Sequence, residues 1–270
     1  MSLADEYFGT PAQQDLARRA RALFEVVKGD PRFTYYGRGV GIVRPQDGGI
    51  DLMSAVIALT GACHFAASAD DEVPQIEAAL QDRGLSTTVF VRWTGSDDAI
   101  AKARDIVAQT ACPTDVTIHK LNADSPPEHL IKLAEVAETG GVLAPAGSVL
   151  RGQTRPGLGI VALDAQGRAV SCAGAAGFCH PDHPEYASQC WWGMLATHPD
   201  RRGERLALVL GAMALIEMRD RYGFASFMTG VVAGNAASEA LCKRLGLSPD
   251  GKSVVSAVDA TVVPGGRITK

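Results

Sequence analysis

The chain has 270 residues, of which 46% are hydrophobic and 21% are charged, a composition typical of globular proteins with a buried core. Its net charge of -4 argues against binding nucleic acid or anionic lipid over the whole surface, because these partners favour a net basic face. No segment is apolar over the roughly 18 residues that a membrane-spanning helix needs. The N-terminal segment also lacks the apolar core of a secretory signal, so we expect no membrane partner and no nucleic-acid partner.

Cysteine usage indicates the compartment. The six cysteines show no C-x-x-C spacing and are spread along a long chain. We therefore predict reduced thiols that act as small hydrophobic side chains in a cytoplasmic protein. These residues are Cys63, Cys112, Cys172, Cys179, Cys190 and Cys242.

Helices and strands alternate in the N-terminal part. Apolar residues at helical spacing predict a first helix over 11–29, which ends at a Gly-Asp-Pro turn. After it we expect strands over 35–45, 63–68 and 86–93, with helices over 70–84 and 96–110. The pattern restarts near Pro113, and we place a domain boundary there, between residues 1–113 and 114–270.

The C-terminal part continues the alternation more clearly. We expect a strand over 115–123, a helix over 125–141 and a Gly/Pro-rich loop or short helix over 141–157. A hairpin over 159–178 and a proline-rich loop over 179–188 come next. A strand over 189–197 and an almost wholly apolar helix to about Tyr222 follow, and then a strand, a helix and a final strand at 225–234, 235–246 and 252–263. This order predicts an α/β fold with a sheet of mixed strand direction.

Two nucleotide-binding motifs occur without their structural context. Residues Gly246 to Ser253 match the phosphate-loop pattern G-x-x-x-x-G-K-[ST], but a helix precedes them and a strand-like run follows. A phosphate loop needs the reverse order, because it leaves a strand and opens a helix whose amides meet the phosphate. Gly157-x-Gly159-x-x-Ala162 fails for the same reason, since it leads into a strand. Nucleotide binding is therefore kept only as a distant alternative.

Cys179, His180 and His183 lie close together in the proline-rich loop. Such side chains bind zinc, but no second pair completes a ligand set, so we predict a loop on the substrate side with no metal.

A basic turn with the sequence PDRRGER leads into the apolar helix. The first N–H groups of a helix have no partner within it, and the helix dipole favours an anion there. Arg201, Arg202 and Arg205 add charge that suits a diphosphate. The helix is apolar on nearly all sides from Leu206 to Ile216, so it must be packed all round and forms a rigid support. The alternative is a solvated basic cap on a buried helix.

Two blocks of the sequence, LATHPDRRGERLALVLGAMAL and VVAGNAASEALCKRLGLSP, resemble the GNAT superfamily of acyl-CoA-dependent N-acyltransferases. The resemblance covers about Gly157 to Val263 and extends back to about Thr114. It implies a mixed, mostly antiparallel GNAT-type sheet flanked by helices, with an additional N-terminal α/β segment that is a specificity module or a degenerate copy of the same fold. It also implies acetyl-CoA as co-substrate and an amine of a small molecule or peptide as acyl acceptor.

The first block corresponds to the family's pyrophosphate loop, Arg/Gln-x-x-Gly-x-Gly/Ala. Arg202 takes the first position and Ala207 the last, whereas Arg205 replaces the middle glycine, so its side chain must point away or replace an amide contact with a guanidinium contact. Asn235 falls where the second helix touches the cofactor, or it simply caps that helix. The resemblance thus implies cofactor binding by Leu195, Ala196, Thr197, Arg202, Gly203, Glu204, Arg205, Leu206, Ala207 and Asn235, the first three through main-chain groups of a splayed strand.

The implied chemistry is direct attack of a neutral amine on the acyl thioester. It needs a base for the amine proton, backbone donors for the oxyanion and an acid for the leaving thiolate. The family's acid is often a tyrosine on the second helix, and Cys242 stands in that place here, as the acid or as a small buried hydrophobe. Glu185, with His180 and His183 beside it, is the candidate base, or a solvated loop residue.

The leading hypothesis from the sequence is therefore an N-acetyltransferase. The main rival is a catalytically impaired, acyl-CoA-binding regulatory module of the same fold, in which Arg205 and Cys242 mark the loss of catalysis. The sequence leaves the acyl acceptor open, and a homodimer is kept as a hypothesis.

Overall fold

In the computed structural model, which describes residues 6–263, ten strands form one sheet in the order β1-β2-β3-β10-β4-β9-β8-β7-β6-β5. The strands are β1 Phe33–Tyr35, β2 Val40–Ile42, β3 Ala62–Ala69, β4 Ser86–Gly95, β5 Thr117–Lys120, β6 Gly157–Leu163, β7 Ala169–Gly177, β8 Gln189–Thr197, β9 Ser226–Val231 and β10 Ser248–Val258. Neighbouring strands are antiparallel except in the pairs β2–β3 and β8–β9. The predicted mixed, mostly antiparallel sheet is confirmed.

Helices cover both faces of this sheet. They are α1 Pro11–Val27, α2 Gly49–Thr60, α3 Val73–Gln81, α4 Asp97–Gln109, α5 Pro127–Thr139, α6 Gly147–Leu150, α7 Leu206–Tyr222 and α8 Ala236–Arg244, with a 3-10 turn at Pro199–Arg201. The sequence analysis missed α2 and expected a single strand where the β1–β2 hairpin lies. Helix α2 is a mostly apolar run without a regular polar face, so its periodicity is weak, and burial against the sheet decides its conformation.

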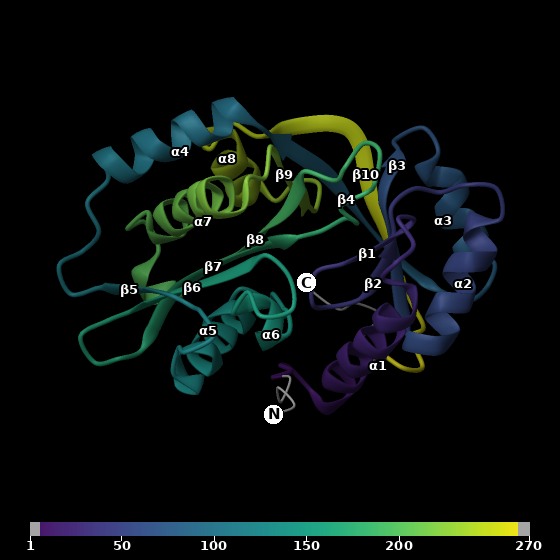
Figure 1. Cartoon of the computed structure of the whole chain (residues 1–270), viewed down its shortest axis with the longest axis horizontal. Coiled ribbons are helices and arrows are strands. Elements are labelled where there is room, and N and C mark those ends of the chain that lie inside the picture. The colour runs from purple at the N-terminus through teal and green to yellow at the C-terminus, as the bar shows by residue number, and fades with distance from the viewer. Residues whose placement is uncertain (1–5, 264–270) are drawn as a thin grey trace.

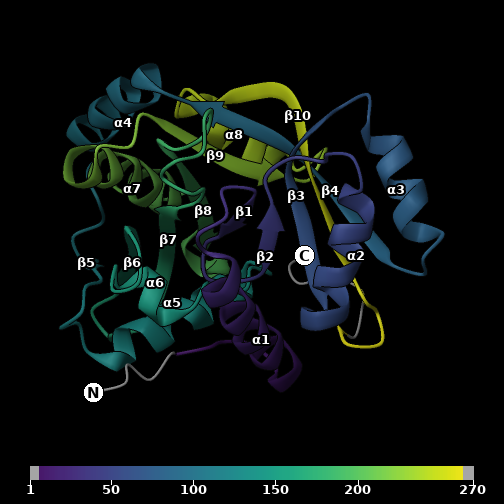
Figure 2. The ribbon, with the colours of Figure 1, turned by 45° about the vertical axis from the view of Figure 1, so that its right-hand side comes forward.

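Alternate residues of each strand belong to the two faces. In β6, Val161 and Leu163 pack with α5, while Ile160 and Ala162 pack with α7. In Figures 1 and 2, α4, α7 and α8 lie together on one side, whereas α1, α2 and α3 accompany the N-terminal strands. Helix α7 lies very close to β8, as a hydrogen bond between them shows: Trp192 Nε1 donates to the Gly211 carbonyl at 2.9 Å. This close packing holds the start of α7 in a fixed place.

Strands from both sides of residue 113 belong to this sheet. Strand β10 pairs with β3 and with β4, and both pairings are antiparallel. Consequently β3 and β4 run parallel to each other, with β10 filling the space between them. Strand β4 in turn pairs with β9, so the segments before and after residue 113 share hydrogen-bonded ladders.

The structure places the rejected motifs and the cysteines as the sequence predicted. Residues 248–258 form β10 and follow α8, and Gly157–Leu163 is β6, so neither glycine motif opens a helix. All six cysteines are free, and all but Cys112 are buried. Within residues 6–263 no helix combines the length and apolarity needed to cross a membrane.

Candidate active site

The parallel strands β8 and β9 separate partway along their length. Their pairing runs from Gln189 with Ser226 to Trp191 with Met228, and no later pair joins them in the described chain. The outer edges stay paired further on, because β7 accompanies β8 to Thr197 and β4 accompanies β9 to its end. The facing edges therefore open into a wedge. This is the splayed strand that the sequence analysis implied for Leu195, Ala196 and Thr197.

A β-bulge lies on the β8 side of the wedge. The register of β7 against β8 shifts between Cys172 and Gly174, and Met194 has a left-handed backbone with φ 56°. Gly174 makes room for the bulge, since a Cβ atom there would lie only 2.8 Å from Met194 Cε. Bulges bend a strand and increase its twist, which accounts for the direction in which β8 leaves β9.

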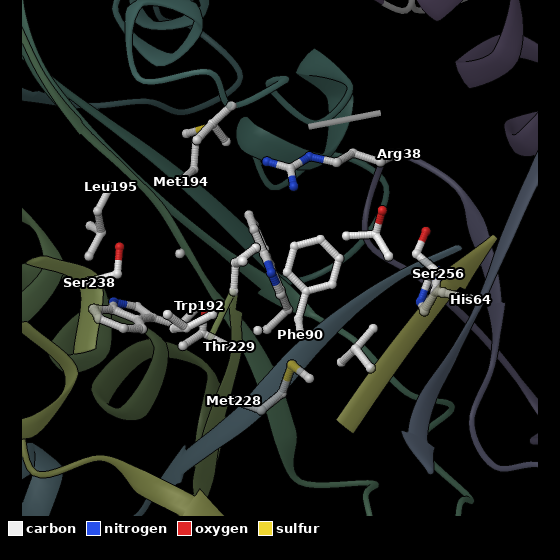
Figure 3. A pocket seen from close by; sticks show the side chains of 18 of the residues that line it. Arg38, His64, Phe90, Trp192, Met194, Leu195, Met228, Thr229, Ser238 and Ser256 are labelled. Carbon is white, nitrogen blue, oxygen red and sulfur yellow. The ribbon is translucent and has the colours of Figure 1, made fainter. Parts of the chain in front are cut away.

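A cavity of about 400 Å³ occupies the wedge and extends over β4, β10 and β3. We call it the aromatic cavity, because Tyr36, Phe90, Phe178, Trp191 and Trp192 line it. In Figure 3, Leu195 and Ser238 lie on one side of the cavity, whereas Arg38, His64 and Ser256 lie on the other. The second side comes largely from the N-terminal part and β10, for which the sequence offered no motif.

The polar groups of the aromatic cavity are mainly hydroxyls, with one guanidinium and one imidazole. Ser256 on β10 lies opposite both His64 on β3 and Thr88 on β4 in the strand register, so the three form a polar row across the sheet. No aspartate or glutamate lines the aromatic cavity among the described residues. A bound amine would therefore find no anion there that favours its charged form.

His64 is a half-buried residue whose imidazole lies between aromatic rings and whose Nε2 atom is buried. Its ring stacks at 6.2 Å on Phe178 and meets Tyr36 edge-on, and its Nε2 has no hydrogen-bond partner. Burial lowers the pKa of His64 to about 4, because it disfavours the charged imidazolium. His64 is thus a neutral group at pH 7. No local sequence signal distinguished it, since a single histidine on a strand has no motif.

A second cavity of about 450 Å³ lies at the N-terminus of α7, and we call it the arginine cavity. Its lining includes Arg201 and six residues that the resemblance implied for the cofactor, namely Thr197, Arg202, Gly203, Arg205, Leu206 and Ala207. Helix α7 has no side-chain cap, so the N–H groups of its first turn have no partner of that kind. The cavity thus combines helix amides with guanidinium groups.

Arg205 keeps the backbone shape that a glycine would supply. It is the N-cap of α7 and has φ 61° and ψ 15°, in the left-handed region. This region favours glycine, and only Met194 shares it among the described non-glycine residues. Arg205 therefore adopts the backbone of the glycine that the sequence resemblance implies at this position, at some cost in strain, and adds a cation to the cavity.

The three arginines of the turn differ in what they contact. Arg201 pairs with Glu204 and with Asp115, which lies before β5, and these hydrogen bonds raise its pKa further above the usual arginine value. Arg202 and Arg205 have no ion pair with any residue of the described range. Glu204 lines neither cavity, so its role is to hold Arg201 and the turn.

Helix α8 forms the opposite wall of both cavities. Asn235 caps it by accepting a hydrogen bond from Ser238 N at 3.2 Å, and it also lines the aromatic cavity. Arg244 lines the arginine cavity and was missed by the sequence analysis. The signal was present, because Ala237, Leu241 and Arg244 recur at helical spacing and share one face.

Cys242 lines the aromatic cavity but is 2% exposed and packs in the core. Burial raises the pKa of its thiol to about 12. An unperturbed thiol has a pKa near 8.5, so Cys242 would be a weaker acid than an ordinary thiol. Proton transfer from Cys242 to a leaving thiolate would therefore be unfavourable. This chemistry favours the reading of Cys242 as a small hydrophobe.

The structure does not bring Glu185 to either cavity. Its carboxylate forms ion pairs with Arg44 and Lys252. The Nδ1 atoms of His180 and His183 accept hydrogen bonds from the backbone N–H groups of Asp182 and Glu185. The polar side chains of the proline-rich loop therefore contact the loop's own backbone and neighbouring cations.

Ala196 is likewise outside both cavities. Its side chain is buried, and a Cβ atom on Gly140 would lie 2.9 Å from it. Any cofactor contact of Ala196 would therefore come from its main chain.

No family model matches the sequence, and no curated protein matches it. Solved structures do. A GCN5-related N-acetyltransferase from Kribbella flavida has 13% identity and a TM-score of 0.54, with 93% of this chain and 96% of that chain covered. A tandem GNAT protein from the clavulanic acid biosynthesis pathway has 16% identity and a TM-score of 0.55, with 82% and 75% covered.

A further structure, of a GCN5-related N-acetyltransferase-like protein from Streptococcus suis 89/1591, has 17% identity and a TM-score of 0.50, with 91% of this chain and 99% of that chain covered. These likenesses extend over most of the chain and are not restricted to the part after Thr114, where the sequence motifs lie. The chain therefore has the GNAT fold.

Proposed function

We propose that the protein is an N-acyltransferase that moves an acetyl or other acyl group from acyl-CoA to an amine of a small molecule or peptide. One observation carries this proposal. The arginine cavity and the aromatic cavity share Ala207, Ala237 and Leu241 in their linings, so a single elongated ligand can occupy both through the wedge between β8 and β9.

Coenzyme A fits this path by its chemistry. Its diphosphate suits the arginine cavity, where Arg202, Arg205 and Arg244 surround the uncapped start of α7. Its pantetheine arm, a chain of amides, suits the unpaired edge of β8 next to Leu195, because strand N–H and C=O groups there lack strand partners. The thioester then enters the aromatic cavity.

The transfer itself needs a neutral amine. The amine nitrogen attacks the thioester carbon and forms the new C–N bond, and the C–S bond breaks. The proton lost by the nitrogen is taken up by the departing CoA thiolate, so the products are an amide and a free thiol. The aromatic cavity favours the neutral amine, because its apolar walls contain Arg38 but no carboxylate among the described residues. Main-chain N–H groups at the β8 bulge near Met194 are the donors available to the developing oxyanion.

We infer one cofactor site in each chain. The N-terminal part also contains two parallel strands joined by a helix, β3-α3-β4, but β10 fills the space between them. The turn before α3 carries Asp70, Asp71 and Glu72, whose charge repels a diphosphate. Within residues 6–263, only the β8-α7-β9 unit combines an open wedge with a basic turn.

Isothermal titration of the full chain with CoA and with acetyl-CoA tests the proposal. We expect a dissociation constant in the micromolar range and a stoichiometry of one. An assay of thiol release from acetyl-CoA with a mixed panel of amines then tests for turnover. Absence of CoA binding would reject the proposal entirely.

A CoA-binding module without catalysis is the second candidate. Two observations favour it: the pKa of Cys242 is high, and no carboxylate of the described residues lines the aromatic cavity, so this part of the chain places no strong acid or base beside the wedge. Tight CoA binding with no thiol release from any amine in the panel is the result that this candidate requires.

A further inference from the structure

Arg38 is a buried cation that forms no ion pair with any described residue. Three arginines are buried in the described chain, namely Arg38, Arg92 and Arg151. Arg92 pairs with Asp250, and Arg151 holds Glu6 through Nε at 2.9 Å and Nη2 at 3.1 Å. The same two nitrogens of Arg38 have no hydrogen-bond partner, although its side chain is only 9% exposed.

Aromatic rings hold the Arg38 guanidinium at the aromatic cavity. Its Cζ lies 5.4 Å from the centroid of Tyr36 and 5.1 Å from that of Trp191. Such contacts stabilise the cation, but they provide no hydrogen-bond acceptor for the N–H donors in the plane of the guanidinium. Figure 3 shows the guanidinium pointing into the cavity, on the opposite side from Leu195 and Ser238.

Burying hydrogen-bond donors without partners is unfavourable, and more so for charged groups than for neutral ones. A protein retains such an arrangement where a ligand supplies the missing acceptor. Because no acidic residue of the described chain lines the aromatic cavity, that acceptor must arrive with the ligand.

We propose that Arg38 binds the carboxylate of the acyl acceptor, which is a small amine that also carries a carboxylate and an apolar body, as in an amino acid. This inference rests on the proposed function, because it places the amine of the acceptor toward the thioester and its carboxylate at the far end of the cavity. Arg38 is then a residue that determines substrate specificity and contributes no proton.

The charge in the cavity favours a carboxylate over a phosphate. A phosphate group carries about -1.5 to -2 at pH 7 and recruits several cations, whereas Arg38 is the only arginine or lysine that lines the cavity in the described range. A guanidinium matches the two oxygens of one carboxylate. The apolar body would contact Phe90, Phe178 and Met228, which form the cavity wall.

Matched ligands test the proposal. CoA-saturated protein is titrated with the proteinogenic amino acids, the carboxamide of each and the amine that lacks the carboxylate. We expect at least one amino acid to bind at least about tenfold more tightly than its carboxamide, since a charged hydrogen-bonded pair contributes about 1.5–3 kcal/mol. Arg38→Gln should abolish this preference, and Arg38→Lys should restore part of it.

Steady-state kinetics distinguish a loss of carboxylate binding at Arg38 from a general disturbance of the fold. Arg38→Gln should raise KM for the amino acid about tenfold or more relative to KM for its carboxamide, with the affinity for CoA unchanged. Arg104→Gln is the matched control, because this exposed arginine pairs with Asp220 far from both cavities. The control should behave as the wild-type chain does.

Three results would overturn the proposal: no amino acid preferred over its carboxamide, an unchanged preference in Arg38→Gln, or a stronger preference for phosphoethanolamine than for every carboxylate tested. Failure of the proposed function gives a different signature, namely no CoA binding or no thiol release. In that case the same amino acids and carboxamides are titrated into the protein without CoA, which still measures carboxylate binding to Arg38.

Discussion

Arg201 donates hydrogen bonds to both carboxylate oxygens of Asp115, at 2.9 and 3.1 Å, and so ties the turn before α7 to the segment before β5. The same guanidinium also contacts Glu204. Arg201 is therefore a structural cation, whereas its neighbour Arg202 has no ion pair in the described chain. Adjacent arginines in one basic turn thus have separate roles.

The first prediction concerns this division. Replacing Arg202 and Arg205 together by alanine should weaken CoA binding at least about tenfold, because two guanidinium groups at the arginine cavity are lost. Titration calorimetry at two salt concentrations measures the effect, and the double variant should show the weaker salt dependence.

Arg201→Ala provides the matched comparison. It should lower Tm, because two carboxylates lose their partner, and change CoA binding less than the double variant does. If Arg201→Ala weakened binding more than the double variant at unchanged Tm, the assignment of roles within the turn would be wrong.

The second prediction separates the backbone of Arg205 from its charge. Arg205→Gly and Arg205→Ala both remove the guanidinium, but only glycine relieves the left-handed backbone at φ 61°. The glycine variant should therefore be more stable than the alanine variant by about 1 kcal/mol. Urea unfolding measures this difference, and equal stabilities would contradict the strain argument.

The third prediction concerns Cys242. Burial raises its pKa to about 12, so it is a poor proton donor to a leaving thiolate. Cys242→Ala should leave turnover within a few-fold of the wild-type value, with some loss of stability from the cavity that it creates. Steady-state kinetics test this, and a loss of about a hundredfold or more would make Cys242 the acid.

The fourth prediction concerns Glu185. A general base removed from an enzyme costs about a hundredfold or more in rate. Because Glu185 pairs with Arg44 and Lys252 away from both cavities, we expect Glu185→Gln to change kcat by less than a few-fold. A hundredfold fall in kcat, with unchanged affinity for CoA, would restore Glu185 as the base.

The fifth prediction follows from the buried imidazole of His64. Its pKa is about 4 in the folded chain and about 6.5 when unfolded, so between these values the unfolded chain binds more protons. Stability from neutral His64 is complete above pH 6.5 and is lost as the pH falls toward 4. Between pH 7 and pH 5 the wild-type chain should lose about 2 kcal/mol more than His64→Gln.

Denaturant unfolding at the two pH values measures this difference. Parallel losses in the wild-type chain and in His64→Gln would show that His64 titrates normally.

Local sequence patterns were enough to predict most of the helices and strands, and also the residues that line the arginine cavity at the start of α7. The helix from Leu206 to Tyr222, the cap at Asn235 and the strand of Trp191 and Trp192 all carry strong local signals of periodicity and capping. The residues of the basic turn are neighbours in the sequence, so they lie together in one cavity wall whatever the rest of the chain does. Their grouping could therefore be predicted from the sequence.

The wall of the aromatic cavity that carries Arg38 follows from long-range contacts. Arg38, His64 and Ser256 come from three segments that meet because β10 inserts between β3 and β4 and because β8 diverges from β9. Strand order depends on long-range pairing, which leaves no pattern in a single sequence. The missing partner of Arg38 is likewise a property of its surroundings, since unsatisfied donors exist only once burial has removed water.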